Sequence, residues 1–368
     1  MRTIRRLIYR EVVESVVFVA TGFLALFFFF DFVDELPNVG KGPAGAAYKL
    51  SQALVYVTLM IPNHLYELLP IAVLIGTIFV MARLAQSSEY TILRTSGLGP
   101  WRAMRTLLGL GVIFTVLTFA TGDYLAPVAD RTAQLLKASY EGRISVGQTG
   151  AWLKEKQPFH TYNVNVNALS PTGDMRGVRI FEADPRGLLV SVTSAARGKF
   201  ADDGSWTLLE VERSEFTTQG KLAKVERSKA PSLRWPTGIS QEMVSVALLQ
   251  PDRMGTIDLF QYIQHLDANG QTSQRYEIEF WRKVFYPLSC IVMVVLALPF
   301  AYLHFRSGGI TSYVFGGVLI GISFFLLNNV FGYVGNLQNW WPWLTAASPG
   351  LIYSMFSLAA FGWLVLRR

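Results

Sequence analysis

The stretch from Leu54 to Arg83, LVYVTLMIPNHLYELLPIAVLIGTIFVMAR, decides the fold class. It is apolar over most of its length, and Glu67 is its one acidic residue. A helix needs about 20 such residues to cross a hydrocarbon core of about 30 Å. A soluble fold has little room for an exposed apolar run of this length. The stretch is therefore predicted to span a membrane.

Five further runs have the same character, and a polar stretch separates the third run from the fourth. The six candidate spans are Val12–Phe32, Leu54–Arg83, Ala103–Leu125, Phe280–Leu303, Ile310–Val334 and Leu344–Leu366. Of the 368 residues, 51% are hydrophobic and 16% charged, which is less charge than the usual quarter in soluble domains. We therefore divide the chain into residues 1–126 with three spans, a polar insertion at 127–275, and residues 276–368 with three more.

The chain has a net charge of +7, and its basic residues cluster in alternate loops between the spans. This placement argues against a nucleic-acid-binding surface. The cationic groups near the span ends are Arg2, Arg5, Arg6, Arg10, Arg83, Arg94, Arg102, Arg105, His304, Arg306, Arg367 and Arg368. The positive-inside rule places such loops in the cytoplasm, together with both termini. The insertion then lies outside, in the periplasm of a Gram-negative cell. The first run is long, ends at Asp31 and lacks an A-x-A cleavage pattern, so we interpret it as an uncleaved span.

The insertion has the pattern of an all-β domain. Apolar and polar residues alternate over Tyr162–Asn167 and around Leu209, and turn signals recur as PTGD at 171, DPRG at 184, DDGS at 202 and TTQG at 217. Short strands at this spacing favour an antiparallel sandwich. Helices are predicted at Pro127–Tyr140, leading into the domain, and at Ile257–Asn269, leading out of it.

The sequence lacks the motifs of the common hydrolytic enzymes. It contains no G-x-x-x-x-G-K-[ST] phosphate loop and no G-x-S-x-G turn, and its four histidines are scattered without ligand spacing. The single cysteine, Cys290, lies in the fourth span and is interpreted as a packed small side chain. We therefore expect a non-catalytic chain that binds no metal and no cofactor of its own.

The segment RLAQSSEYTILRTSGLGPWR (83–102), between spans two and three, predicts a short cytoplasmic helix. Ser87 is a candidate N-cap, Glu89 lies in the first turn, and Gly97 can end the helix. Glu89, Ile92, Leu93 and Ser96 would share one face. Two interpretations stay open: a helix lying on the lipid surface, and a coupling helix that docks into a groove of a separate motor protein.

The fifth span holds small and polar residues at membrane depth. Gly317 and Gly321 have G-x-x-x-G spacing, which favours close packing against another helix of this chain or of a second subunit. Asn328 and Asn329 fit interhelical hydrogen bonds, with lining of a cavity as the alternative.

Several segments together resemble one transporter family. LLPIAVLIGTIFVMARLAQSSEYTILRTSGL (68–98), GDYLAPVADRTAQ (122–134) and WRKVFYPLS (281–289) are similar to the lipopolysaccharide export permeases LptF and LptG. The L-A-Q-x-S-E form and FVDELPNVGKG (32–42) resemble the LptG branch more closely.

This resemblance implies a permease subunit of an ABC transporter that extracts lipopolysaccharide from the inner membrane and passes it to a periplasmic bridge. It implies a β-jelly roll in the insertion, and three partners: an LptF-like subunit, an LptB-like ATPase dimer that uses ATP and Mg²⁺, and a single-span LptC-like protein. The coupling residues would be Glu89, Ile92, Leu93 and Arg94. The alternatives are the sister subunit LptF and a non-transporting scaffold or sensor with a ligand-binding periplasmic domain.

An exported glycolipid needs cations for its phosphates and an apolar cavity for its acyl chains. The candidate phosphate contacts are Lys41, Lys137, Arg282 and Lys283. The candidate cavity residues are Phe27, Phe30, Phe324, Leu327 and Asn328. Asp31 departs from the family, whose LptG members often have a lysine there, and an acid would repel phosphate unless it is paired or bridged by a divalent cation.

Overall fold

The computed structural model describes residues 2–41, 47–87, 89–95, 97, 99–141, 150–170, 173–201, 203–219, 222–247, 251–302 and 310–363. The chain forms two compact units. The helical unit comprises Met1–Glu35, Val57–Ala129 and Glu277–Arg368, and the sheet unit comprises Leu36–Tyr56 and Asp130–Tyr276. The segment after the first span therefore belongs with the polar insertion, an association that the linear order of the sequence does not reveal.

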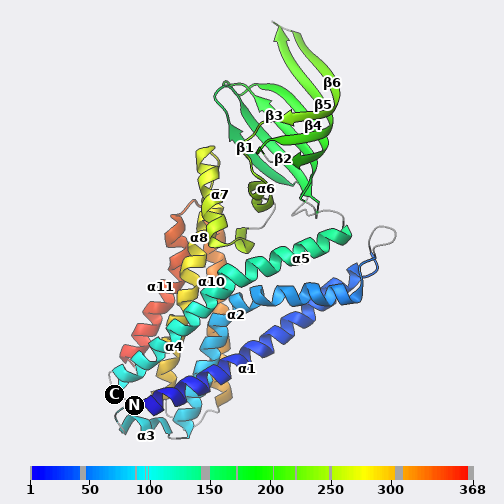
Figure 1. Ribbon diagram of the computed structural model, residues 1–368. Coiled ribbons are helices and arrows are strands. Elements are labelled where there is room, and N and C mark those ends of the chain that lie inside the picture. Colours follow the sequence, from blue (N-terminus) through cyan, green and yellow to red (C-terminus); the bar gives the residue numbers. More distant parts are fainter. Residues whose placement is uncertain are drawn as a thin grey trace. The chain divides into compact units, whose positions relative to one another are not determined.

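Helices make up most of the helical unit (Figure 1). They are α1 (Arg2–Glu35), α2 (Leu50–Gln86), α3 (Glu89–Thr95), α4 (Pro100–Ala120), α8 (Gln274–Phe285), α9 (Ser289–Ala297), α10 (Ile310–Leu337) and α11 (Pro342–Phe361), with the first residues of α2 and α8 in the sheet unit. A π-helical turn, η2 (Thr121–Leu125), follows α4, and the short helices η4 (Tyr286–Leu288) and η5 (Leu298–Tyr302) flank α9.

Six stretches among the described residues are long and apolar enough to cross a membrane, which confirms the predicted spans. They are Ile4–Asn38, Leu50–Gln86, Pro100–Lys137, Gln274–Tyr302, Thr311–Leu337 and Pro342–Phe361. Span three runs as a continuous helical stretch through η2 into α5 (Ala126–Glu141), where the sequence predicted a separate helix at Pro127–Tyr140.

Small residues bring the spans close together. A Cβ atom on Gly321 would lie 2.7 Å from the Ile71 side chain, and one on Gly317 would lie 2.8 Å from Ile78, so α10 packs against α2 of the same chain. This result answers the question that the G-x-x-x-G spacing left open. Cys290 is buried and unpaired by disulfide, with its sulfur 3.2 Å from the Thr118 hydroxyl, in agreement with a packing role.

The start of α1, helix α3 and the end of α11 lie at the same end of the helical unit (Figure 1). One apolar cluster joins them, since it contains Ile8, Tyr90, Ala103, Tyr302 and Phe361. Since the first and last helices have their outer ends on the same side, the chain crosses the helical unit an even number of times.

The sheet unit is built on one antiparallel sheet. Its strands, hydrogen-bonded in sequence order, are β1 (Ala151–Lys156), β2 (Thr161–Leu169), β3 (Met175–Ala183), β4 (Leu189–Phe200), β5 (Trp206–Gln219) and β6 (Leu222–Trp235). The described residues of the predicted turns lie between neighbouring strands, and Gly173, Gly187 and Gly204 have the positive φ angles of such turns. Pro171, Thr172, Asp202 and Gly220 of these turns lie outside the described residues. The all-β insertion is confirmed. Short hairpin turns hold consecutive strands side by side, so the described strands form a meander rather than the expected pair of facing sheets.

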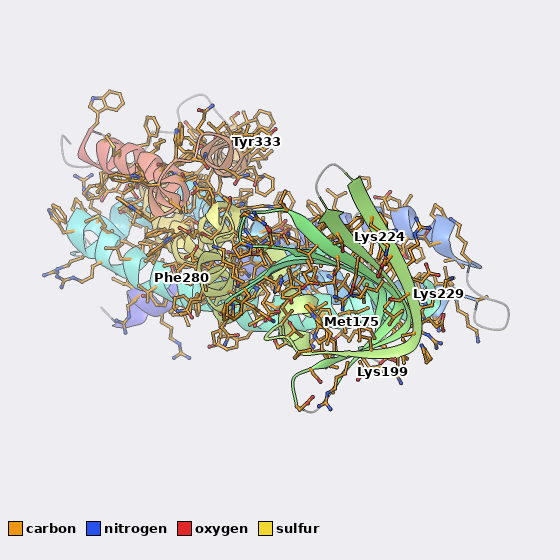
Figure 2. All side chains as sticks on the ribbon, turned by 90° about the horizontal axis from the view of Figure 1, so that it is seen from above. Met175, Lys199, Lys224, Lys229, Phe280 and Tyr333 are labelled. Carbon is orange, nitrogen blue, oxygen red and sulfur yellow. The ribbon has the colours of Figure 1, made fainter. Side chains whose placement is uncertain are left out.

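Helix α6 (Gln241–Ala247) lies against β1, at one edge of this sheet. Trp206 is fully buried and donates its indole N–H to the Ile239 carbonyl at 2.9 Å, just before α6. α7 (Thr256–Ala268) confirms the predicted helix at Ile257–Asn269. In Figure 2, Met175 marks β3 inside the sheet, and Lys224 and Lys229 mark β6 at its edge.

Candidate coupling helix and substrate-path residues

Helix α3 has an anchored side and a free side. Tyr90 is 3% exposed and donates a hydrogen bond from its hydroxyl to the Tyr302 hydroxyl at 3.0 Å, with the two rings edge to face. Leu93 packs against the same apolar cluster. Glu89 is exposed, and Ile92 is 63% exposed. The helix therefore offers an acid and one aliphatic side chain to a partner.

This geometry corrects two details of the predicted helix. Leu93 does not share the exposed face with Ile92. It lies on the same side of the helix as Tyr90, which packs into the bundle. The Ser87 hydroxyl donates to the carbonyls of Arg83 and Leu84, so it serves the end of α2. Ser96 lies outside the described residues.

Arg94 and Gly97 complete the segment. The guanidinium group of Arg94 lies over the Tyr302 ring, 5.8 Å from its centroid. Gly97 has φ +99° and donates its N–H to the Arg94 carbonyl, so it ends the helix as predicted. Burial, together with the hydrogen bond to Tyr302, raises the pKa of Tyr90.

The four candidate phosphate cations belong to different units. Lys41 and Lys137 lie in the sheet unit, where Lys41 is exposed and the Lys137 amino group lies 4.9 Å from the Tyr56 ring centroid. Arg282 lies in the helical unit and donates to Glu279 at 2.8 Å and to Asn329 at 3.2 Å. Asn329 thus forms the interhelical hydrogen bond that was one of its two interpretations.

Lys283 differs from the other three cations. It is 6% exposed, and its amino group donates to the Gly122 carbonyl at 3.0 Å while lying 5.6 Å from the Tyr66 ring centroid. Gly122 belongs to the π-helical turn η2, in which backbone hydrogen bonds join residues five apart instead of four. A Cβ atom at Gly122 would lie 2.2 Å from the Tyr66 ring. The geometry therefore gives Lys283 a role in joining α8 to η2, and we withdraw it as a phosphate contact.

Asp31 has a partner inside the chain. Its carboxylate lies 2.6 Å from Nε2 of His64 on α2, with the two side chains 29% and 15% exposed. The Phe27 ring lies against His64, at a centroid distance of 4.9 Å. The acid that departs from the family pattern thus has a hydrogen-bonding partner within the chain.

The candidate cavity residues separate into two groups. Phe27 and Leu327 are partly buried and Phe30 is 54% exposed, so these three offer apolar surface. Phe324 is 2% exposed and packs between the Tyr286 and Tyr353 rings, and Asn328 is 5% exposed. Phe324 and Asn328 therefore belong to the interior of the helix bundle, which corrects their assignment to a cavity wall.

Sequence reasoning missed Tyr90, Tyr302, Tyr66 and His64. Each is a polar aromatic residue inside or beside an apolar run, and such residues bury their rings only where the polar atom finds a partner. That signal was available, although the identity of the partners was not. Within the described part of the chain, no group of three or more histidine, cysteine or acidic side chains could hold a metal ion.

Comparison with known proteins decides the family. The family model "Lipopolysaccharide export system permease LptF/LptG" matches residues 6–367. The chain belongs to this family. It is 28% identical to the lipopolysaccharide export system permease protein LptG of Escherichia coli strain K12, over 92% of this chain and 90% of that protein. It is 24% identical to the LptG protein of Haemophilus influenzae, over 100% of this chain and 99% of that protein.

Membership of the LptF/LptG family fixes the general function. The chain is a permease subunit of a lipopolysaccharide export system and a multi-pass protein of the inner membrane. The six candidate membrane spans among the described residues and the inserted β-sheet are consistent with such a permease. The expected resemblance to LptG is confirmed, since the two relatives above carry that name.

Proposed function

We propose that this permease subunit is driven by a separate ATPase, and that α3 transmits the ATPase's movement into the membrane helices. One observation carries the proposal: α3 is fixed to the bundle through Tyr90 and Leu93 while Glu89 and Ile92 remain exposed. A helix built in this way moves the bundle when a partner moves its exposed side. A helix lying passively on lipid needs no buried tyrosine pair.

The proposed assembly follows the family. This chain pairs with an LptF-like sister subunit, an LptB-like ATPase dimer binds α3, and an LptC-like single-span protein joins them. ATP and Mg²⁺ are used by the ATPase, and this chain binds no cofactor. Both termini and α3 lie in the cytoplasm, because the cationic loops gather on that side. The sheet unit then lies in the periplasm.

The proposed substrate path uses the candidate residues other than Lys283, Phe324 and Asn328. Lys41, Lys137 and Arg282 attract the phosphates of lipopolysaccharide at the periplasmic side, where long cationic side chains reach the head-group level. Phe27, Phe30 and Leu327 contact its acyl chains. The hydrogen bond to His64 holds the Asp31 carboxylate against α2.

Co-purification tests the docking role of α3. Glu89→Arg reverses the charge at the exposed end of α3 and is expected to abolish co-purification of the ATPase, whereas Glu89→Asp retains it. Asp267→Arg makes the same reversal at an exposed position of α7 and is the matched control, expected to leave the complex intact. An intact complex and undiminished export with Glu89→Arg would contradict the proposal.

A further inference from the structure

A cavity of about 550 Å³ lies within the helical unit, lined by the N-terminal half of α1, the last turns of α2 and the start of α10. Pockets for small molecules typically measure about 300–1,000 Å³. Phe27, Phe30 and Leu327 are not among the residues that line it. The cavity therefore does not include the acyl-chain contacts proposed above.

The charged groups of the cavity gather at one end. Glu11 and Glu14 on α1 and Arg83 on α2 line this end, and Arg83 forms an ion pair with Glu11. Glu14 is paired with Arg10 at 2.7 Å, and both side chains are largely exposed. Two carboxylates and one guanidinium group therefore line the same small space.

The rest of the cavity is mainly apolar. Its apolar lining consists of Phe18, Val19, Ile75, Phe79, Val80 and Val314. From Glu11 to Val19, α1 rises about 12 Å. That depth is close to one leaflet of a hydrocarbon core about 30 Å thick. The cavity thus has a charged mouth and an apolar interior of the depth that a membrane lipid occupies.

We propose that this cavity binds one aminophospholipid from the leaflet at the N-terminal end of α1. The lipid's ammonium group donates hydrogen bonds to the Glu14 carboxylate and the Ser15 hydroxyl, and its phosphate accepts from Arg83. One acyl chain lies along Phe18 and Phe79. An anionic lipid without an ammonium group is disfavoured, because Glu11 and Glu14 are balanced by Arg83 and Arg10, so no excess positive charge is left for a phosphate that has no ammonium group beside it.

This site is independent of the coupling role of α3. It rests on the lining of the cavity, and only the naming of its leaflet as cytoplasmic depends on the proposed orientation. Loss of ATPase docking would leave lipid binding unchanged, so the two proposals fail separately.

Lipid titration of the purified full-length chain in its transporter complex tests the proposal. The delipidated complex is incubated with phosphatidylethanolamine, phosphatidylcholine or phosphatidylglycerol of identical acyl chains, and retained lipid is measured by native mass spectrometry. Phosphatidylethanolamine is expected to bind about tenfold more tightly than either other lipid, because loss of a hydrogen bond to a charged group costs about that factor. Equal retention of all three lipids would overturn the proposal.

Variants of α1 locate the binding. Ser15→Trp fills the cavity and is expected to abolish the preference for phosphatidylethanolamine, whereas Val17→Trp places the same ring on the exposed face outside the lining and preserves it. Glu14→Gln keeps the size of an exposed side chain, so it gives a result even where the tryptophan variant fails to assemble. It is expected to reduce phosphatidylethanolamine binding towards that of phosphatidylcholine. Unchanged selectivity in Glu14→Gln would contradict the assignment.

A photo-crosslinker at Phe79 distinguishes the occupants. Capture of phosphatidylethanolamine supports the lipid site. Capture of a transmembrane helix of a partner subunit, with no lipid adduct, would show that protein fills the cavity and would refute the proposal.

Discussion

Several charged side chains within the described spans are held by other groups of the same chain. Lys283 donates to Gly122, Arg282 bonds Glu279 and Asn329, and Asp31 faces His64. Burying a charge is costly unless it is hydrogen-bonded or paired, so these contacts are required wherever the helices come together. The sequence identified several of these residues as unusual. It could not separate internal partners from ligand contacts, because the partners are distant along the chain.

Lys283→Met tests the link between α8 and η2. Methionine keeps the length and apolar stem of the side chain but cannot donate to the Gly122 carbonyl. The complex is expected to lose about 1–2 kcal/mol of stability, measured as a lower thermal unfolding temperature in detergent. Lys283→Arg, which keeps a donor, is expected to lose less. Normal stability of Lys283→Met together with impaired phosphate-dependent lipid binding would instead restore the phosphate role.

His265 on α7 predicts a pH dependence in the sheet unit. Burial lowers the pKa of His265, although nearby Glu155 opposes this effect. The folded state therefore binds the proton less readily than the unfolded chain, whose histidine has a pKa of about 6.5. Stability is expected to fall as the pH drops through about 6.5 towards the lower folded pKa, and to recover as the pH rises.

Hydrogen exchange of α7 in the full-length protein, corrected for intrinsic rates, measures this effect between pH 7.5 and pH 5.5. Protection of α7 is expected to fall in acid, and His265→Gln is expected to flatten the change. His160→Gln alters another histidine of the same unit, whose side chain is 39% exposed, and is the matched control. Equal acid sensitivity of the parent protein and His265→Gln would contradict the assignment.

At the scale of elements, the sequence predicted those helices that have a strong local signal. All six spans follow from apolar length, and α5 and α7 begin and end within a residue of their predicted bounds. Local patterns did not predict η2, whose Gly122 contacts Lys283 and Tyr66 from other helices. Nor did periodicity settle which face of α3 is buried.

Close packing of α1 on α2 predicts that alanine substitutions at two glycines change the stability of the protein in different directions. A Cβ atom at Gly76 would lie 2.8 Å from the Val16 backbone nitrogen, whereas one at Gly22 would meet no atom within 4 Å. Gly76→Ala is expected to destabilise the protein by about 1–3 kcal/mol, because backbone must move. Gly22→Ala is expected to be neutral or to stabilise by up to about 1 kcal/mol through helix propensity. Thermal unfolding of the two variants is the measurement, and equal effects would contradict this packing.

At the scale of the whole molecule, the division into spans, insertion and spans could be predicted because composition changes sharply along the chain. The resemblance of a few segments was enough to indicate the LptF/LptG family, which the match over residues 6–367 establishes. The order of the strands was less predictable. Hairpin turns such as Asp184–Gly187 fix which strands are neighbours, but alternation alone does not distinguish one curved sheet from two facing sheets.

The central claim is that α3 transmits force, and the most direct test weakens its buried anchor while leaving its exposed face unchanged. Tyr90→Ala removes the ring that packs against Tyr302, and Tyr90→Phe removes only the hydroxyl. The reconstituted complex is assayed in proteoliposomes for lipopolysaccharide extracted per ATP hydrolysed. We predict that Tyr90→Ala keeps the ATPase bound and active but lowers this ratio about fivefold or more, with a smaller loss for Tyr90→Phe. An unchanged ratio in a stably assembled Tyr90→Ala complex would contradict the account.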